Sequence, residues 1–156
     1  MPHNYSVEEI KKNVEISLGV LFINDSFLLQ ESVHERSVAH KLAEYLQTRF
    51  PDWNVDCEYD KKGLSLKTLE GIHQCSDQRR TDRVLPDIII HKRNTRQNLL
   101  VVEAKLGKDD TCDVEKLKKF TSVDGDFGYK LGVFIKFNST EEPSLRWFEK
   151  GNEEGK

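Results

Sequence analysis

Long hydrophobic runs are missing from this sequence. The most apolar stretch, Ile16 to Ile23, is interrupted by Ser17 and Gly19 and is far shorter than the ~20 residues that a membrane-spanning helix needs. The chain opens with the polar sequence MPHNYSVEEIKK, which lacks the apolar centre of a secretory signal. We therefore expect a cytoplasmic protein that has no membrane partner.

Cysteine is scarce. The sequence has Cys57, Cys75 and Cys112, an odd number spaced too widely for a zinc site of the CxxC type. His73 and Cys75 are close in sequence, but two ligands without a second pair make a weak zinc site, and we interpret them as loop residues. We expect reduced thiols, as is typical of a cytosol-like compartment.

An excess of positive charge is also missing. The 156 residues carry 24 Lys and Arg against 27 Asp and Glu, which gives a net charge of -3. Nucleic-acid-binding domains commonly carry a strongly basic surface, so any such role must depend on local clusters of Lys and Arg. Charge of both signs is abundant, because charged residues make up 33% of the chain against a typical ~25%. The length and the lack of a linker or internal repeat predict one domain, residues 1–156.

Helical periodicity marks three segments. Ser6 lies three residues before Glu9, the spacing of a capping box, and predicts a helix that runs to about Phe22. Ser32 as N-cap and Pro51 beyond the end define a second helix. The apolar faces expected to meet a core are Val38, Leu42, Tyr45 and Leu46 in the second helix, and Val114, Leu117 and Phe120 in a third over Thr111–Phe120.

Strand patterns occupy the middle and the end of the sequence. The aliphatic runs Asp87–Arg93 and Asn98–Leu106 are nearly continuous, which predicts central strands buried on both faces and joined by the short loop NTRQ. The charged, glycine-containing tail after Phe148 is expected to fray. The predicted class is α/β, in the order helix, helix, strand, strand, strand, helix, strand. The remaining strands are predicted at Val55–Tyr59 and Tyr129–Asn138, with an edge element around Leu145–Phe148.

Three charged residues lie among these aliphatic runs: Asp87, Glu103 and Lys105. Charged side chains are rarely buried unless they pair or hold a metal. Alternate residues of a strand share a face, so Glu103 and Lys105 are neighbours, and pairing of the two strands brings Asp87 close to them. Two carboxylates with room for water suit Mg²⁺, and a nearby lysine can orient the attacking water. The alternative is a Glu103–Lys105 ion pair on a partly exposed strand, with Asp87 capping the turn after Pro86.

Glu35 belongs to the apolar stripe of the second helix. At about 100° per residue it falls in line with Val38 and Leu42 rather than on the solvent face, so its carboxylate is expected to point toward the sheet. Glu35 also lies three residues after Ser32 and can complete a capping box there. The two roles are compatible.

The motif residues have a known counterpart. Pro86-Asp87 at the start of one strand and Glu103-Ala104-Lys105 in the next resemble the motif of the PD-(D/E)xK nuclease superfamily, which has the restriction-endonuclease-like fold. The resemblance covers about residues 32–138. It implies an αβββαβ core with a mixed central sheet flanked by helices, to which the N-terminal helix and the C-terminal tail are additions.

The resemblance also implies roles for single residues. Asp87 and Glu103 would bind Mg²⁺ or Mn²⁺, Lys105 would position the hydrolytic water, and Glu35 would bind metal or orient water. A nuclease of this kind hydrolyses phosphodiester bonds in DNA or RNA by in-line attack and commonly leaves a 5′-phosphate.

Local basic groups would have to attract a polyanion to a chain of net charge -3. Arg79, Arg80 and Arg83 precede the motif and are predicted to contact phosphates; the alternative is a solvated loop. Lys116 lies at the border of the third helix's apolar stripe, where its long side chain can lean toward the catalytic edge and the substrate. His91 lies at the polar end of its strand, and we interpret it as a solvent-edge residue without a role.

Two classes of function are compatible with these patterns. One is a metal-dependent nuclease whose partner is nucleic acid, DNA in the first place; the other is a non-catalytic module of the same fold that binds nucleic acid or protein. Intact Asp87, Glu103 and Lys105 favour the enzyme. We expect their strands to be the two middle strands of the sheet, packed between the helices of Glu35 and Asp113. Because the chain is short for an enzyme that both reads and cuts, a homodimer or a partner subunit is expected to help.

Overall fold

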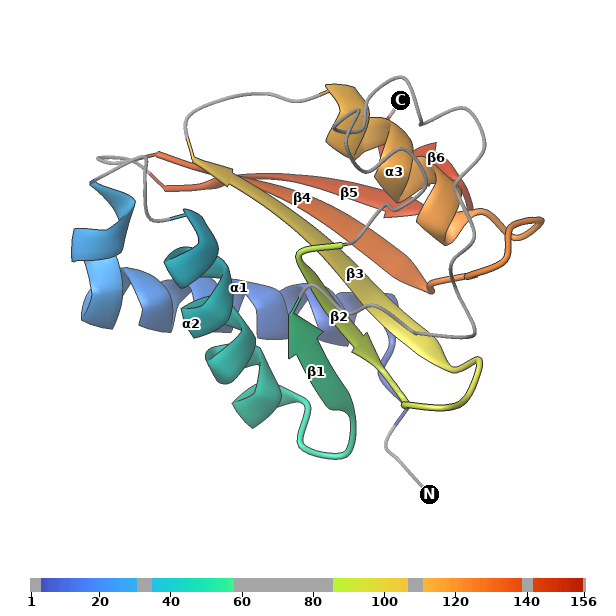
Figure 1. Ribbon diagram of the computed structural model, residues 1–156, viewed down its shortest axis with the longest axis horizontal. Coiled ribbons are helices and arrows are strands. Elements are labelled where there is room, and N and C mark those ends of the chain that lie inside the picture. The colour runs from blue at the N-terminus through green and yellow to red at the C-terminus, as the bar shows by residue number, and fades with distance from the viewer. Residues whose placement is uncertain (1–3, 31–34, 58–85, 107–110, 139–141, 156) are drawn as a thin grey trace.

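One mixed sheet organises the computed structural model of this protein, which describes residues 4–30, 35–57, 86–106, 111–138 and 142–155 (Figure 1). Within these residues, six strands lie side by side in their sequence order, accompanied by three α-helices and a short 3₁₀ helix. The helices are α1 (Val7–Asp25), η1 (Ser26–Leu29), α2 (Glu35–Arg49) and α3 (Thr111–Thr121). The strands are β1 (Asn54–Cys57), β2 (Ile88–His91), β3 (Asn98–Leu106), β4 (Leu131–Phe137), β5 (Ser144–Glu149) and β6 (Asn152–Glu153).

The element order agrees with the α/β prediction from helix α1 to strand β4. β3 and β4 are parallel, and α3 connects them; every other neighbouring pair in the sheet is antiparallel. Parallel strands need a crossover of this kind, whereas β2 and β3 need only the short loop that the sequence predicted.

Helix α1 begins at the predicted capping box. Ser6 Oγ accepts a hydrogen bond from the Glu9 N–H at 3.1 Å, and Glu9 Oε1 accepts one from the Ser6 N–H at 3.0 Å. The helix ends at Asp25 rather than near Phe22, and the Asp25 carboxylate accepts a hydrogen bond from the Tyr45 hydroxyl of α2, which holds this last turn. No helix in the described ranges, α1 included, is long and apolar enough to cross a membrane.

The sheet is covered on both faces, and the parity of a strand residue decides which helices its side chain meets. Ile88 and Ile90 of β2 join the core formed with α1 and α2, whereas Ile89 joins the core formed with α3. In β3, Val102 faces α1 and α2 and Val101 faces α3. The continuous aliphatic runs therefore serve two cores, as predicted.

The centre of the sheet differs from the prediction. The two middle strands are β3 and β4, not the strands of Asp87 and Glu103, because β5 and β6 extend the sheet beyond β4. The expected position between two helices is confirmed for β3, since α2 and α3 lie on opposite faces (Figure 1).

The prediction that the C-terminal tail frays is wrong. The chain turns back at Lys150 and Gly151, whose φ angles are 53° and 83°. At Gly151 the positive φ carries no steric penalty, because glycine has no Cβ. Phe148 of β5 then pairs with Glu153 of β6, and Arg146 Nη2 lies 2.8 Å from Glu153 Oε1. Charge and glycine in the tail thus form a hairpin with its own ion pair.

The cysteines also differ from the prediction. Cys57, at the end of β1, is exposed and not disulfide-bonded, as expected. Cys112, in the first turn of α3, is disulfide-bonded, so the expectation of three reduced thiols is wrong there. Spacing along the chain gave no signal, because a disulfide depends on the distance between two cysteines in space.

Candidate active site

Asp87 lies at the entrance to β2, where the register with β3 brings it beside Glu103 and Ala104. Its carboxylate is fixed by the backbone of β3, since Asp87 Oδ2 accepts a hydrogen bond from the Ala104 N–H at 2.8 Å. Burial raises the pKa of Asp87 above its ordinary value, in spite of this hydrogen bond and two nearby ammonium groups. The predicted proximity of Asp87 to the Glu103 strand is confirmed.

Glu103 is buried under α3, with 1% of its surface exposed. It has the parity of Val101, which packs against α3, so its side chain lies on that face. Burial, followed by the negative charge of Asp87, raises the pKa of Glu103 well above its ordinary value. Its Oε1 atom is shielded from solvent and has no hydrogen-bond partner in the described part of the chain. A nearby positive charge stabilises the ionised form of such a carboxyl group.

Lys105 shares the face of Glu103, two residues further along β3. Its ammonium group lies between two carboxylates, 3.7 Å from Glu35 Oε1 and 3.8 Å from Asp113 Oδ2. The side chain remains 31% exposed, so it is partly accessible to solvent. The carboxylates of Glu35 and Asp113 therefore hold Lys105 from two sides, next to Glu103 on the same strand.

Glu35 begins α2 and reaches the end of β3. Its Oε2 atom accepts a hydrogen bond from the Leu106 N–H at 3.2 Å, and its Oε1 atom faces Lys105. The carboxylate thus points toward the sheet, as its position on the helix stripe predicted. The alternative capping box involves Ser32, which lies outside the described residues.

Two substitutions should separate the contacts of Glu35. Glu35→Gln keeps an oxygen that accepts from the Leu106 N–H but removes the charge beside Lys105, whereas Glu35→Ala removes both. We expect Glu35→Ala to lower the free energy of unfolding by about 1 kcal/mol and Glu35→Gln to leave it nearly unchanged. Urea unfolding measures this, with Ser37→Ala on the exposed side of α2 as the control. An equal loss in Glu35→Gln would assign the effect to charge instead of the hydrogen bond.

Lys116, on α3, reaches the buried carboxylate. Its Nζ atom lies 3.1 Å from Glu103 Oε1 and 3.3 Å from Asp113 Oδ1. Burial by itself would lower the pKa of Lys116, but the charges of Glu103, Asp113 and Asp87 outweigh it and raise the pKa. Lys116 leans from α3 toward Glu103, as its place at the border of the apolar stripe predicted; its contact with phosphate stays a prediction.

Asp113 is a residue of the cluster that sequence reasoning missed, because it was interpreted only as part of the helix start. Its residue is 3% exposed, and its carboxylate contacts both Lys105 and Lys116. The signal was present: Asp113 precedes Leu117 by four residues and Phe120 by seven, so it lies on the apolar stripe of α3. A carboxylate on such a stripe has the same pattern as Glu35 on α2.

Asp87 and Glu103 have the chemistry of a magnesium site. Mg²⁺ takes oxygen ligands and is commonly held by one or two carboxylates together with water and substrate phosphate. The buried Glu103 Oε1 atom, shielded from solvent and 3.1 Å from the Lys116 ammonium, is an oxygen that prefers a positively charged neighbour. Among the residues that the structure describes, no group of three or more His, Cys, Asp or Glu side chains could hold a metal ion. A metal site formed by Asp87 and Glu103 stays a prediction.

The predicted phosphate contacts Arg79, Arg80 and Arg83 lie outside the described residues, and their role stays a prediction. The positive groups that the structure places at the carboxylates are Lys105 and Lys116. Both come from elements that the sequence predicted, β3 and α3.

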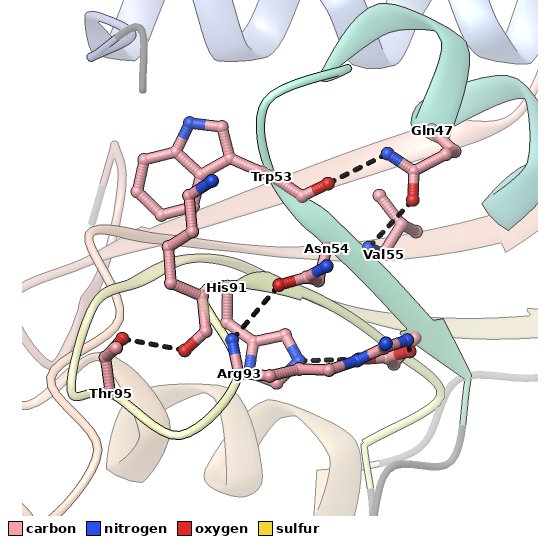
Figure 2. A network of polar contacts seen from close by, with 9 residues as sticks. Gln47, Trp53, Asn54, Val55, His91, Arg93 and Thr95 are labelled. Atoms are coloured by element: carbon pink, nitrogen blue, oxygen red, sulfur yellow. Dashed lines mark hydrogen bonds and ion pairs between the residues drawn. The ribbon is translucent and has the colours of Figure 1, made fainter. Parts of the chain in front are cut away.

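A second polar cluster lies at the far end of β2 (Figure 2). His91, expected at a solvent edge, is 0% exposed, because β1 pairs alongside β2 and brings Asp56 next to it. The His91 Nε2 atom lies 2.7 Å from Asp56 Oδ2, to which Arg93 Nε also donates at 3.0 Å. On the other side of β1, Gln47 of α2 accepts a hydrogen bond from the Val55 N–H at 3.2 Å. The cluster ties β1 to both neighbouring elements, which is a structural role.

The Asp56 carboxylate should make stability depend on pH. Burial by itself would raise its pKa, but hydrogen bonds from Arg93 and His91 outweigh burial and lower the pKa. A lowered pKa means that the ionised group stabilises the fold above the ordinary carboxylate range and that this contribution is lost as the pH falls through the folded-state pKa.

We expect Asp56→Asn to cost about 2 kcal/mol of unfolding free energy at pH 7 and less at pH 3, which lies below the ordinary pKa of an aspartate, because the contribution of the ionised group is being lost there. Urea unfolding at both pH values measures the difference. Asp52→Asn, in the exposed turn before β1, is the matched control. A cost that does not change with pH would contradict the role given to the Asp56 charge.

Comparison with protein-family models and with curated proteins identifies no relative. No protein-family model matches the chain, and no curated protein gives a significant match. A function has to be argued from the residues of the site and their geometry.

Proposed function

We propose that this protein is a metal-dependent nuclease of the PD-(D/E)xK superfamily with the restriction-endonuclease-like fold. One arrangement carries the proposal: Asp87 and Glu103 adjoin at one end of the β2–β3 pair, and Lys105 lies beside them on β3 with Glu35 within 3.7 Å. The order α2, β1, β2, β3, α3, β4 corresponds to an αβββαβ core, to which α1, β5 and β6 are additions.

In this proposal, two carboxylates bind the metal and a lysine positions the water or the phosphate. Asp87 and Glu103 would hold Mg²⁺ or Mn²⁺, which when bound would polarise the scissile phosphate and lower the pKa of a coordinated water. The Ala104 N–H keeps Asp87 oriented toward this position. Lys105, held between Glu35 and Asp113, keeps its ammonium group where it can donate a hydrogen bond to the attacking water or to a phosphate oxygen.

A cleavage assay tests the proposal. The full chain is incubated with single-stranded, linear duplex, supercoiled and branched DNA and with RNA, in Mg²⁺, Mn²⁺, Ca²⁺ or EDTA. We expect cleavage of at least one substrate in Mg²⁺ or Mn²⁺, with 5′-phosphate ends, and no cleavage in EDTA. Undiminished cleavage in EDTA, or intact substrates in every condition, would overturn the proposal.

The alternative function is a non-catalytic module that binds nucleic acid or a protein partner. The Lys116 ammonium favours it, because this group already lies 3.1 Å from the buried Glu103 carboxylate and stabilises its charge without a metal. The same panel discriminates between the two functions. A binding module retains nucleic acid in a mobility-shift assay and leaves it uncut in Mg²⁺ and Mn²⁺.

The basic residues before Asp87 provide a test of substrate binding. If Arg79, Arg80 and Arg83 contact phosphates, replacing all three by Gln should weaken binding to every sequence. The slope of log affinity against log salt should also flatten by about one unit per lost contact. Binding is measured in Ca²⁺ to suppress cleavage, with Lys12→Gln and Lys119→Gln, which are exposed, as controls that each remove one positive charge. An unchanged slope would mean that the three arginines are a solvated surface.

A further inference from the structure

Lys116 is placed where it meets the buried carboxylate of the proposed metal site. Its Nζ atom is 3.1 Å from Glu103 Oε1, and only 17% of its side chain is exposed. Glu103 Oε1 is shielded from solvent, and among the described residues the Lys116 ammonium is the positive group that lies against it. The ammonium group of a residue on α3 thus lies against this carboxylate.

Among the described residues, carboxylates outnumber ammonium groups in this cluster. Asp87, Glu103, Asp113 and Glu35 contribute four carboxylates, against the two ammonium groups of Lys105 and Lys116. The cluster therefore has carboxylate oxygens of the kind that a divalent cation binds.

A metal ion and the Lys116 ammonium cannot both use Glu103 Oε1 at low cost. Mg²⁺ would lie about 2.1 Å from its carboxylate oxygen, so the two cations would be at most about 5 Å apart, in a place with little water to screen their repulsion. Lys116 has a second partner available, because its Nζ atom is already 3.3 Å from Asp113 Oδ1. A small movement would leave the ammonium group paired with Asp113 alone.

We propose that Lys116 is a tethered cation that competes with the divalent metal for Glu103: it holds the carboxylate when metal is absent and shifts onto Asp113 when metal binds. This inference rests on the proposed metal site and adds a residue that sets the metal affinity. Asp113 is then a positioning residue that retains Lys116 beside the site and keeps the ammonium group near the substrate.

The test measures Mn²⁺ affinity by isothermal titration calorimetry and the melting temperature in EDTA and in Mn²⁺. Lys116→Gln removes the competing charge and should bind Mn²⁺ at least about tenfold more tightly than the wild type. Its melting temperature should fall in EDTA and should rise more on adding Mn²⁺ than that of the wild type. Lys119→Gln, in the same helix and exposed, is the control and should match the wild type in both measurements.

A second variant covers the case in which Lys116→Gln does not fold. Lys116→Arg keeps the charge and adds a fork that can pair with Glu103 through two N–H groups, so it should bind Mn²⁺ about tenfold more weakly than the wild type. Mn²⁺ affinities that are equal in Lys116→Arg and the wild type would overturn the inference, as would an affinity in Lys116→Gln no tighter than that of the wild type.

The outcomes separate this inference from the proposed function. Tight wild-type binding and Mn²⁺-dependent cleavage, with no gain in Lys116→Gln, overturn the role of Lys116 and leave the nuclease intact. Mn²⁺ binding in Lys116→Gln but not in the wild type supports competition by Lys116 and contradicts a metal-dependent enzyme in the natural chain. No Mn²⁺ binding by either protein overturns both.

Discussion

Glu103→Gln is expected to reduce metal-dependent cleavage at least about 100-fold, to the background of the assay, while the protein stays folded. The substitution keeps the shape of the side chain but removes the charged oxygen ligand on β3, and with it the divalent-metal site. Burial and the charge of Asp87 raise the pKa of Glu103, so the site disfavours the ionised carboxylate and should accept a neutral amide of the same shape. Mn²⁺ titration and cleavage rates measure the two effects separately.

Asp87 and Lys105 should give different patterns from each other. Asp87→Asn should lose both metal binding and cleavage, since Asp87 is the second carboxylate of the site. Lys105→Ala should lose about 10²- to 10⁴-fold in rate and retain metal binding, because its ammonium group acts on water and phosphate. Lys136→Ala, which pairs with Lys105 in the sheet register on neighbouring β4, is the matched control. Full cleavage by the Glu103 or Asp87 variant would end the nuclease proposal.

Gly132→Leu is expected to cause the largest loss of stability, about 3 kcal/mol of unfolding free energy. Gly132 lies on β4 directly beneath α3, where an added Cβ would be 3.1 Å from Thr121 Cγ2 and 3.3 Å from Leu117 Cδ2. Another methyl contact, Val101 Cγ1 at 3.3 Å, closes the space from β3. A larger side chain must push α3 away from the sheet.

The displacement of α3 should also reach the site, because Lys116 and Asp113 are on that helix. We expect Gly132→Leu to bind Mn²⁺ with altered affinity as well as to melt at lower temperature. Gly19→Leu on α1 is the matched control: an added Cβ there has no neighbour within 4 Å, and replacing a helical glycine should leave stability unchanged or raise it. A Gly132→Leu protein as stable as the wild type would show that α3 is not packed as closely as the structure has it.

Periodicity explains why most elements were predictable from the sequence. The Ser6–Glu9 capping box depends on residues three apart, and β3, Asn98–Leu106, is a continuous aliphatic run ending in the motif. Such signals are local, so they can be recognised without knowledge of the fold. The neighbouring positions of Glu103 and Lys105 follow from strand alternation alone.

Contacts between distant segments could not be predicted in the same way. His91 was expected in solvent, but β1 pairs beside it and supplies Asp56. The tail was expected to fray, but β5 offers an edge on which Glu153 pairs with Phe148. In each case the residue pairs with another strand, and the local sequence pattern does not predict where that strand lies.

The sequence by itself determined the α/β order, the two-sided burial of β2 and β3, and the shared face of Glu103 and Lys105, because all of these follow from local periodicity. The place of Asp87 beside them depends on the pairing of β2 with β3. Only the tertiary structure decided that Asp113 belongs to the cluster and that Lys116 lies 3.1 Å from Glu103. These contacts depend on how closely α3 approaches the sheet, and residues far from them in sequence set that distance.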